Sequence, residues 1–216
     1  MLIVEIINFI NRTRNTIVMK SIIILSFILS SWKLSAQQTS EAAFSKSYSF
    51  EYETQYAKAI TALTDLHLDS YQINLRLGWL YYLSKDYVKS EQCYRKAVTA
   101  EPSSIEARFG LVLPLSTLGN WNSVLLVYLE IVKLDPNNSI ANYRIGSIYF
   151  ARKDYVNSKL YVSKVLKLYP FDYDSNLLSG KILIAQAKNI EAKKYITKAL
   201  EYNPQSEEAK TLLKKL

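Results

Sequence analysis

Hydrophobic and polar residues follow a helical period along most of the chain after residue 70. Large residues stand three or four positions apart, as Leu77 and Tyr81 do, which places them on one face of a helix. Short polar segments interrupt this pattern, and their sequences are SKDY, LGNW, RKDY and AKNI, beginning at residues 84, 118, 152 and 187. Such segments are typical of the turn inside a helix hairpin. The pattern therefore predicts a succession of paired helices.

The pairs recur at a fixed interval. Four prolines are spaced by 34 residues and close similar segments, TAEP, KLDP, KLYP and EYNP; they are Pro102, Pro136, Pro170 and Pro204. Three glycines each stand 24 residues before one of these prolines: Gly78, Gly146 and Gly180. A proline ends a helix, and a glycine lets a second helix approach closely. The spacing predicts stacked repeats, since no single unit can bury its own apolar faces.

This arrangement resembles the tetratricopeptide repeat family, whose pattern is W-x2-L-G-x2-Y…A-x3-F…P over 34 residues. The unit 71–104 carries Leu77-Gly78, Tyr81, Ala97 and Pro102 at the matching places. The units 139–172 and 173–206 keep the glycine and the proline. The unit 105–138 departs from the pattern, because Val112 stands where the glycine is expected.

The resemblance implies an all-α fold, a right-handed helical-hairpin solenoid of the tetratricopeptide type with a C-terminal capping helix. Four units are expected, at residues 71–104, 105–138, 139–172 and 173–206, with residues 207–216 as the capping helix. Upstream, Tyr56, Ala59 and Leu63 repeat the spacing of a second helix. Residues 37–70 are therefore expected to form a degenerate first repeat or an N-terminal cap.

In this family the first helices of successive units line a concave groove, with positions 5, 9 and 12 of each unit pointing inward. Carried over to this chain, the resemblance implies a partner-binding groove, formed by Leu75, Trp79, Tyr82, Phe109, Leu113, Tyr143, Ser147, Phe150 and Lys181. Ser116, Leu177 and Ile184 complete the same set of positions. A groove of this kind suits a peptide or helix with apolar anchors. The alternative is that the rings pack between helices and belong to the core.

The N-terminal 36 residues are expected to be a targeting segment. Lys20, the apolar run 22–29 and the small residues before Gln37 have the layout of a secretory signal at residues 19–36. The apolar run is shorter than the ~20 residues that a spanning helix needs. We therefore expect an exported, periplasmic or envelope-associated protein with no stable membrane span after cleavage. Whether Met1 or Met19 starts the chain stays open, as does a cytoplasmic location.

Charge and composition exclude several classes of function. Outside the targeting segment 23 Lys and Arg face 18 Asp and Glu without a clustered basic run, so no nucleic-acid partner is expected. One Cys, one His and five Gly leave no pattern for a metal site, a catalytic triad or a phosphate-binding loop. The chain is expected to be no enzyme and to hold no cofactor or metal.

Some individual residues admit two interpretations. Arg76, Arg108 and Arg144 lie on expected first helices and are either anion-binding groups or the solvated side of each helix. Cys93 is expected to be a buried, inert thiol rather than a nucleophile. Pro114 falls inside an expected helix, which it should kink or divide.

The function expected from these observations is that of a non-enzymatic scaffold for protein–protein interaction, which binds a peptide or helix of a partner in the groove. The alternative is a cytoplasmic or membrane-anchored adaptor within a larger complex. Members of the family that bind chaperone tails use Lys, Asn and Arg at five places. Those places hold Leu75, Trp79, Gly110, Ile140 and Arg144 here. Only the arginine fits, so chaperone-tail binding is not expected.

Overall fold

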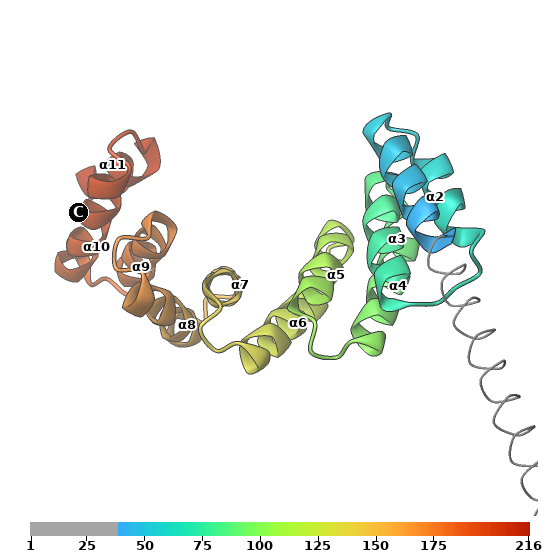
Figure 1. Cartoon of the computed structure of the whole chain (residues 1–216). Helices are drawn as coiled ribbons and strands as arrows, with labels where there is room; N and C mark the ends of the chain where they lie inside the picture. Colours follow the sequence, from blue (N-terminus) through green and yellow to red (C-terminus); the bar gives the residue numbers. More distant parts are fainter. Residues whose placement is uncertain (1–38) are drawn as a thin grey trace, which may run out of the picture. The chain divides into compact units, whose positions relative to one another are not determined.

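The computed structural model describes residues 39–216, and all of its regular structure is helical (Figure 1). The expected targeting segment, residues 1–36, lies outside the described residues. The described residues divide into two parts, 39–68 and 69–216. In the first, residues 39–52 form a helix and α2 follows at Tyr56–Thr64, with Ala43, Ala59 and Leu63 buried.

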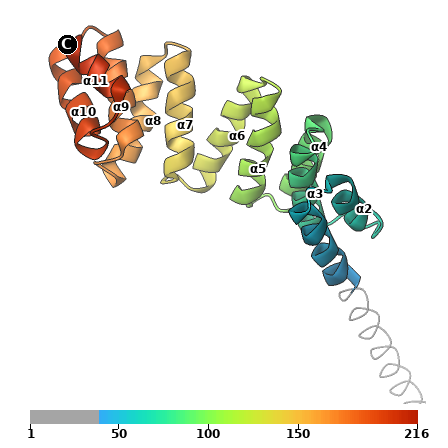
Figure 2. The same ribbon diagram turned by 90° about the horizontal axis from the view of Figure 1, so that it is seen from above.

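The second part, residues 69–216, consists of consecutive antiparallel helix pairs, seen side by side in Figures 1 and 2. Its helices are α3 (Tyr71–Leu83), α4 (Tyr87–Ala100), α5 (Ile105–Thr117), α6 (Trp121–Leu134), α7 (Ser139–Ala151), α8 (Tyr155–Leu168), α9 (Tyr173–Ala185), α10 (Asn189–Tyr202) and α11 (Glu207–Lys214). Each helix contacts the next along the chain. The expected all-α stack of helix hairpins is confirmed, and α5 runs through Pro114 as one helix instead of being divided there.

Polar residues at fixed places begin these helices. Positions are counted from the first residue of each 34-residue repeat unit, at residues 71, 105, 139 and 173. Position 34 is Ser104, Asn138, Asp172 or Ser206, and its side chain caps the helix that follows. Position 16 is Asp86, Asn120 or Asp154 in three units, and it caps the second helix. The same residues recur because each cap satisfies a backbone N–H that the first helical turn leaves without a partner.

A buried asparagine fixes the turn between units. Asn142 Nδ2 donates hydrogen bonds to the carbonyl oxygens of Pro136, at 3.0 Å, and Asn138, at 2.8 Å. Asn176 repeats both bonds one unit later, to the carbonyls of Pro170 and Asp172. These bonds satisfy carbonyls at the very turn where the proline ends the helix, so the link between units is held from inside.

Close helix approach depends on small residues at positions 8 and 20. Ser90 Oγ donates to the carbonyl oxygen of Gly78 at 2.7 Å, and Ser158 Oγ to that of Gly146 at 2.8 Å. A Cβ added to Gly146 would lie 2.5 Å from Val162 Cγ2 and 3.3 Å from the carbonyl oxygen of Ser158. The backbone of α7 at Gly146 therefore lies directly against the side chain of Val162 in α8.

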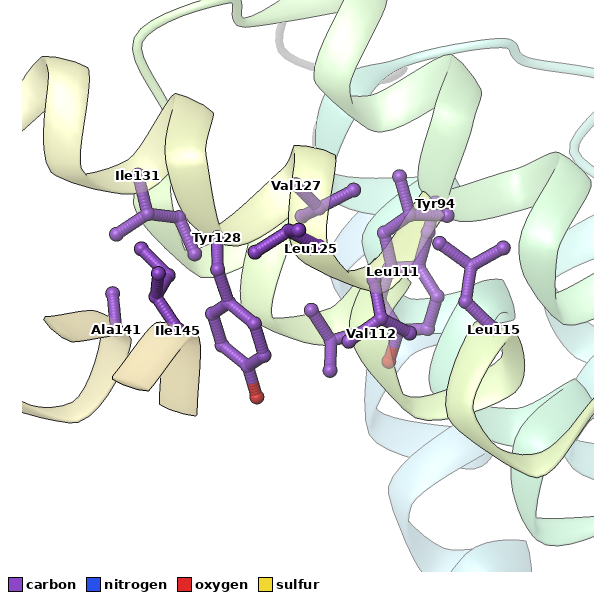
Figure 3. Packing of buried hydrophobic residues seen from close by; sticks show 11 residues of the cluster. Tyr94, Leu111, Val112, Leu115, Leu125, Val127, Tyr128, Ile131, Ala141 and Ile145 are labelled. Atoms are coloured by element: carbon purple, nitrogen blue, oxygen red, sulfur yellow. The ribbon is translucent and has the colours of Figure 1, made fainter. Parts of the chain in front are cut away.

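The main buried cluster of residues 69–216 joins α4, α5, α6 and α7 (Figure 3). Ile131, Ala141 and Ile145 meet at one end of it, and Leu111 and Leu115 lie toward the other. The ring of Tyr94 is 3% exposed and fills the space against two glycines, because a Cβ at Gly78 would lie 2.8 Å from that ring and one at Gly110 would overlap it. Gly110 therefore gives α5 a close contact with α4, although α5 lacks a glycine at position 8, where Val112 stands.

Replacement of Gly146 by Leu should destabilise the protein. The added side chain would overlap Val162, at a cost of about 1–3 kcal/mol or more, whereas helix propensity favours the change by only up to ~1 kcal/mol. Thermal or urea unfolding measures the balance. Ala151→Leu makes a similar change at an exposed site of the same helix and should have little effect. A melting temperature that rises in Gly146→Leu would show that the glycine is not a contact point.

The inner turns give a second prediction. Position 15 adopts a left-handed conformation in all four units, with φ of 65° at Lys85, 73° at Gly119, 61° at Lys153 and 58° at Ala187. Non-glycine residues are strained there by roughly 1–2 kcal/mol, offset in part by chain entropy. Unfolding measurements should therefore find Ala187→Gly more stable and Gly119→Ala less stable, each by about 1 kcal/mol. Equal signs for the two changes would contradict this explanation.

Candidate functional site

The second unit lacks a pair of rings that the first and third units have. Positions 12 and 17 carry aromatic side chains in tilted contact there: the ring centroids of Tyr82 and Tyr87 lie 5.6 Å apart, and those of Phe150 and Tyr155 lie 5.8 Å apart. In the second unit position 17 is Trp121, but position 12 is Ser116. A serine cannot fill the volume of a ring, so space opens beside α5.

The same unit also lacks the small residues that bring its helices together. Positions 8 and 20 are Val112 and Val124, whereas the other units have glycine followed by serine or alanine. The two buried valines hold the helices apart, and α5 and α6 contact each other less extensively than the helices of the other hairpins do.

A cavity of about 720 Å³ lies beside Ser116 and the two valines. It is bounded by α5, α6 and α7, with one wall from the end of α3. Its lining consists of Tyr82, Val112, Leu113, Ser116, Thr117, Trp121, Val124, Tyr128, Arg144, Ser147, Ile148, Ala151 and Arg152. Most of these side chains are apolar or aromatic. Ligand-binding sites have this composition and a volume of ~300–1,000 Å³.

Two aromatic side chains define the cavity's character. Trp121 is the first residue of α6 and is 54% exposed. Its equivalents Tyr87 and Tyr155 each contact a ring at position 12, whereas that position is Ser116 beside Trp121. Tyr128 is buried, in edge contact with Phe109 at 6.3 Å between ring centroids. Burial raises the pKa of the Tyr128 hydroxyl, against the opposing effect of Arg144, so the group is a neutral donor or acceptor at physiological pH.

Arg144 and Arg152 supply the only charges in this lining of described residues. Both side chains are exposed. Arg152 Nη2 donates to Asn122 Oδ1 at 2.8 Å and to the carbonyl oxygen of Trp121 at 3.4 Å, which fixes the guanidinium at the edge of the cavity. Arg144 lies over the ring of Tyr143, with 5.9 Å between Cζ and the centroid.

The cavity brings together three of the residues predicted for the groove. Tyr82, Leu113 and Ser147 line it, and Ser116 from the wider set does so as well. The prediction missed Trp121 and Arg152, because it considered only the inward positions of first helices. The sequence does contain a signal for Trp121. Position 17 is aromatic in three units, and of these three only the second lacks a ring at position 12.

The other predicted residues lie elsewhere. Leu75, Trp79 and Phe109 are half-buried against the main cluster, and Trp79 also stacks on Tyr82 at 6.0 Å. Phe150 packs against the cluster of Val162, Leu178 and Ile182. These rings contribute to packing between helices, which is the alternative that the sequence left open.

Tyr143 and Lys181 occupy separate places. Tyr143 lines a smaller hollow of about 390 Å³ near the α8–α9 turn, together with Asp172 and Asp174. Lys181 forms an ion pair with Glu208 of α11. Of the wider set, Leu177 is buried beneath α11 rather than open to a partner.

The three arginines of the first helices differ from one another. Arg108 is 7% exposed; its Nε donates to Glu130 Oε2 at 3.0 Å and its Nη1 to the carbonyl oxygen of Ser104 at 2.9 Å. Arg76 is also buried. The interpretation of these two as a solvated stripe or as accessible anion-binding groups is therefore wrong, and only Arg144 remains accessible.

Reactive chemistry is sparse in the described part of the chain. Cys93 is half-buried, and burial raises the pKa of its thiol to about 11, so the nucleophilic thiolate is a minor form. His67 is exposed and directly follows the turn after α2. Between residues 39 and 216, no three His, Cys, Asp or Glu side chains gather to hold a metal ion. No helix within that range could cross a membrane.

A tetratricopeptide repeat model matches the sequence at residues 71–104, 140–172 and 173–206. The unmatched interval between the first two contains α5 and α6, the hairpin with the valine pair. Comparison with curated protein sequences finds no match.

Solved structures share the fold at low sequence identity. A crystal structure of MamA is 17% identical, with a TM-score of 0.68 over 78% of this chain and 94% of that one. MamA from Desulfovibrio magneticus RS-1 is 15% identical, with a TM-score of 0.66 over 78% and 97%. YrrB, described as a TPR protein with an unusual peptide-binding site, is 15% identical, with a TM-score of 0.69 over 86% and 97%.

The repeated sequence pattern, the stacked hairpins and these matches agree. The chain belongs to the tetratricopeptide repeat family.

Proposed function

We propose that this protein is a non-enzymatic scaffold that binds a segment of a partner protein in the cavity between α5, α6 and α7. The observation that carries the proposal is the absence of a ring at Ser116 in a fold that otherwise fills this place. An apolar hollow of about 720 Å³ beside a 54% exposed Trp121 is suited to a large apolar side chain.

The chemistry of the site favours binding over catalysis. Its lining offers arginines, hydroxyls and apolar groups, but no carboxylate, histidine or cysteine that could act as a base or nucleophile. The peptide-binding description of YrrB gives independent support for a peptide as the ligand, because the two chains share the fold.

We also propose that the protein is exported, on the basis of the signal-like residues 19–36. A cytoplasmic or membrane-anchored adaptor is the alternative. If export occurs, the protein isolated from cells should begin near Gln37 and be found outside the cytoplasm. Intact-mass measurement of each cell fraction tests this. Recovery of a cytosolic form that retains Met1 would overturn the export proposal without affecting the binding site.

Ser116→Phe tests the binding site directly. The ring should occupy the cavity beside Trp121, as Phe150 does beside Tyr155, so the melting temperature should stay the same or rise while partner binding falls at least tenfold. Quantitative pull-down from a native extract compares the partners that each variant retains. Ile184→Phe introduces the same ring at position 12 of the fourth unit, away from the cavity, and should retain them.

Two results would contradict the proposal. One is equal retention of every partner by the original chain and Ser116→Phe. The other is equal loss in Ser116→Phe and Ile184→Phe, which would assign the effect to the added ring rather than to the cavity.

A further inference from the structure

The charges along the first helices are of one sign where the cavity lies. From position 5 to position 14 of each unit, the segments LRLGWLYYLS, FGLVLPLSTL, YRIGSIYFAR and LLSGKILIAQ contain Arg76, Arg144, Arg152 and Lys181 and no Asp or Glu. Glu106 and Asp174, the acidic residues of α5 and α9, lie at position 2, near the other end of each helix. Asp86 and Asp154 follow at position 16, where they cap α4 and α8. The cavity lining itself holds two cations, Arg144 and Arg152, and no carboxylate.

Pairing distinguishes the cations at the cavity from others on the first helices. Arg108 is paired with Glu130, and Lys181 with Glu208. Arg144 and Arg152, which line the cavity, form no ion pair with any carboxylate of residues 39–216. Arg144 also borders the smaller hollow that Asp172 and Asp174 line, without pairing with either. The acceptors of Arg152 are neutral oxygens of Asn122 and Trp121, which orient the guanidinium without neutralising it.

We infer that the segment bound in this cavity is acidic: one large apolar side chain enters between Leu113 and Trp121, and flanking Asp or Glu side chains pair with Arg144 and Arg152. This rests on the proposed function and specifies the partner's chemistry. Carboxylates beside an apolar hollow form charge-assisted hydrogen bonds that are less screened by water than at an open surface. A basic segment would be repelled by both arginines.

The test uses random linear peptides displayed for selection against the whole chain, with Ser116→Phe as the counter-selection. The selected peptides should combine acidic residues with a large apolar residue. Each is then synthesised with a neutral twin in which Asn and Gln replace Asp and Glu. By fluorescence anisotropy the twin should bind the original chain about tenfold more weakly, as hydrogen bonds to charged groups imply.

The variant with both Arg144→Gln and Arg152→Gln should bind a peptide and its twin equally. A control with Lys133→Gln and Lys167→Gln removes the same charge from exposed sites on α6 and α8, and it should keep the tenfold preference. Raised salt should reduce the preference in the original chain.

The outcomes separate the two proposals. Selected peptides without an excess of acidic residues, or twins that bind the original chain as well as their parents, would overturn the acidic partner while leaving a peptide site. Persistence of the preference in the arginine variant would overturn the roles of Arg144 and Arg152. If no peptide distinguishes the original chain from Ser116→Phe, the proposed binding site itself fails.

Discussion

The close approach of two helices at positions 8 and 20 is the contact on which three of the four repeat hairpins depend. Where a glycine meets a serine, as in Gly78–Ser90 and Gly146–Ser158, a buried hydroxyl bonds directly to a backbone carbonyl. Helices at that distance leave no room for a side chain, which is why an added Cβ would overlap its neighbour. The apolar stripes above and below this level then meet and close the core.

The second hairpin relaxes this constraint, and the candidate site follows from that. Val112 and Val124 keep α5 and α6 further apart, yet the stack continues because Tyr94 of the preceding hairpin packs against Gly110. The contact between α4 and α5, which belong to neighbouring units, thus supports α5 where its contact with α6 is weak. A repeat protein can tolerate a local gap of this kind, since each unit is stabilised by both neighbours.

The cavity combines this gap with charge. Position 12 is Ser116 instead of a ring, and Trp121 remains exposed. Two arginines at the margin form no ion pair within residues 39–216. Apolar depth provides affinity, whereas charge at the margin provides discrimination between acidic and basic segments. The rest of the predicted groove contributes in a different way, because Trp79, Phe109 and Phe150 are occupied in packing helices against one another.

The sequence by itself determined the helix pairs, their period and the family, because caps, turns and apolar stripes act between residues near in the chain. It also predicted Tyr82, Leu113 and Ser147 as inward-facing, since a repeat places equivalent positions on one face. Tertiary structure alone decided which of these positions remain open. Arg108 is buried and pairs with Glu130 of α6, and Leu177 is covered by α11. Burial of a side chain depends on the volumes of neighbours from several helices, and no single unit of the sequence contains them all.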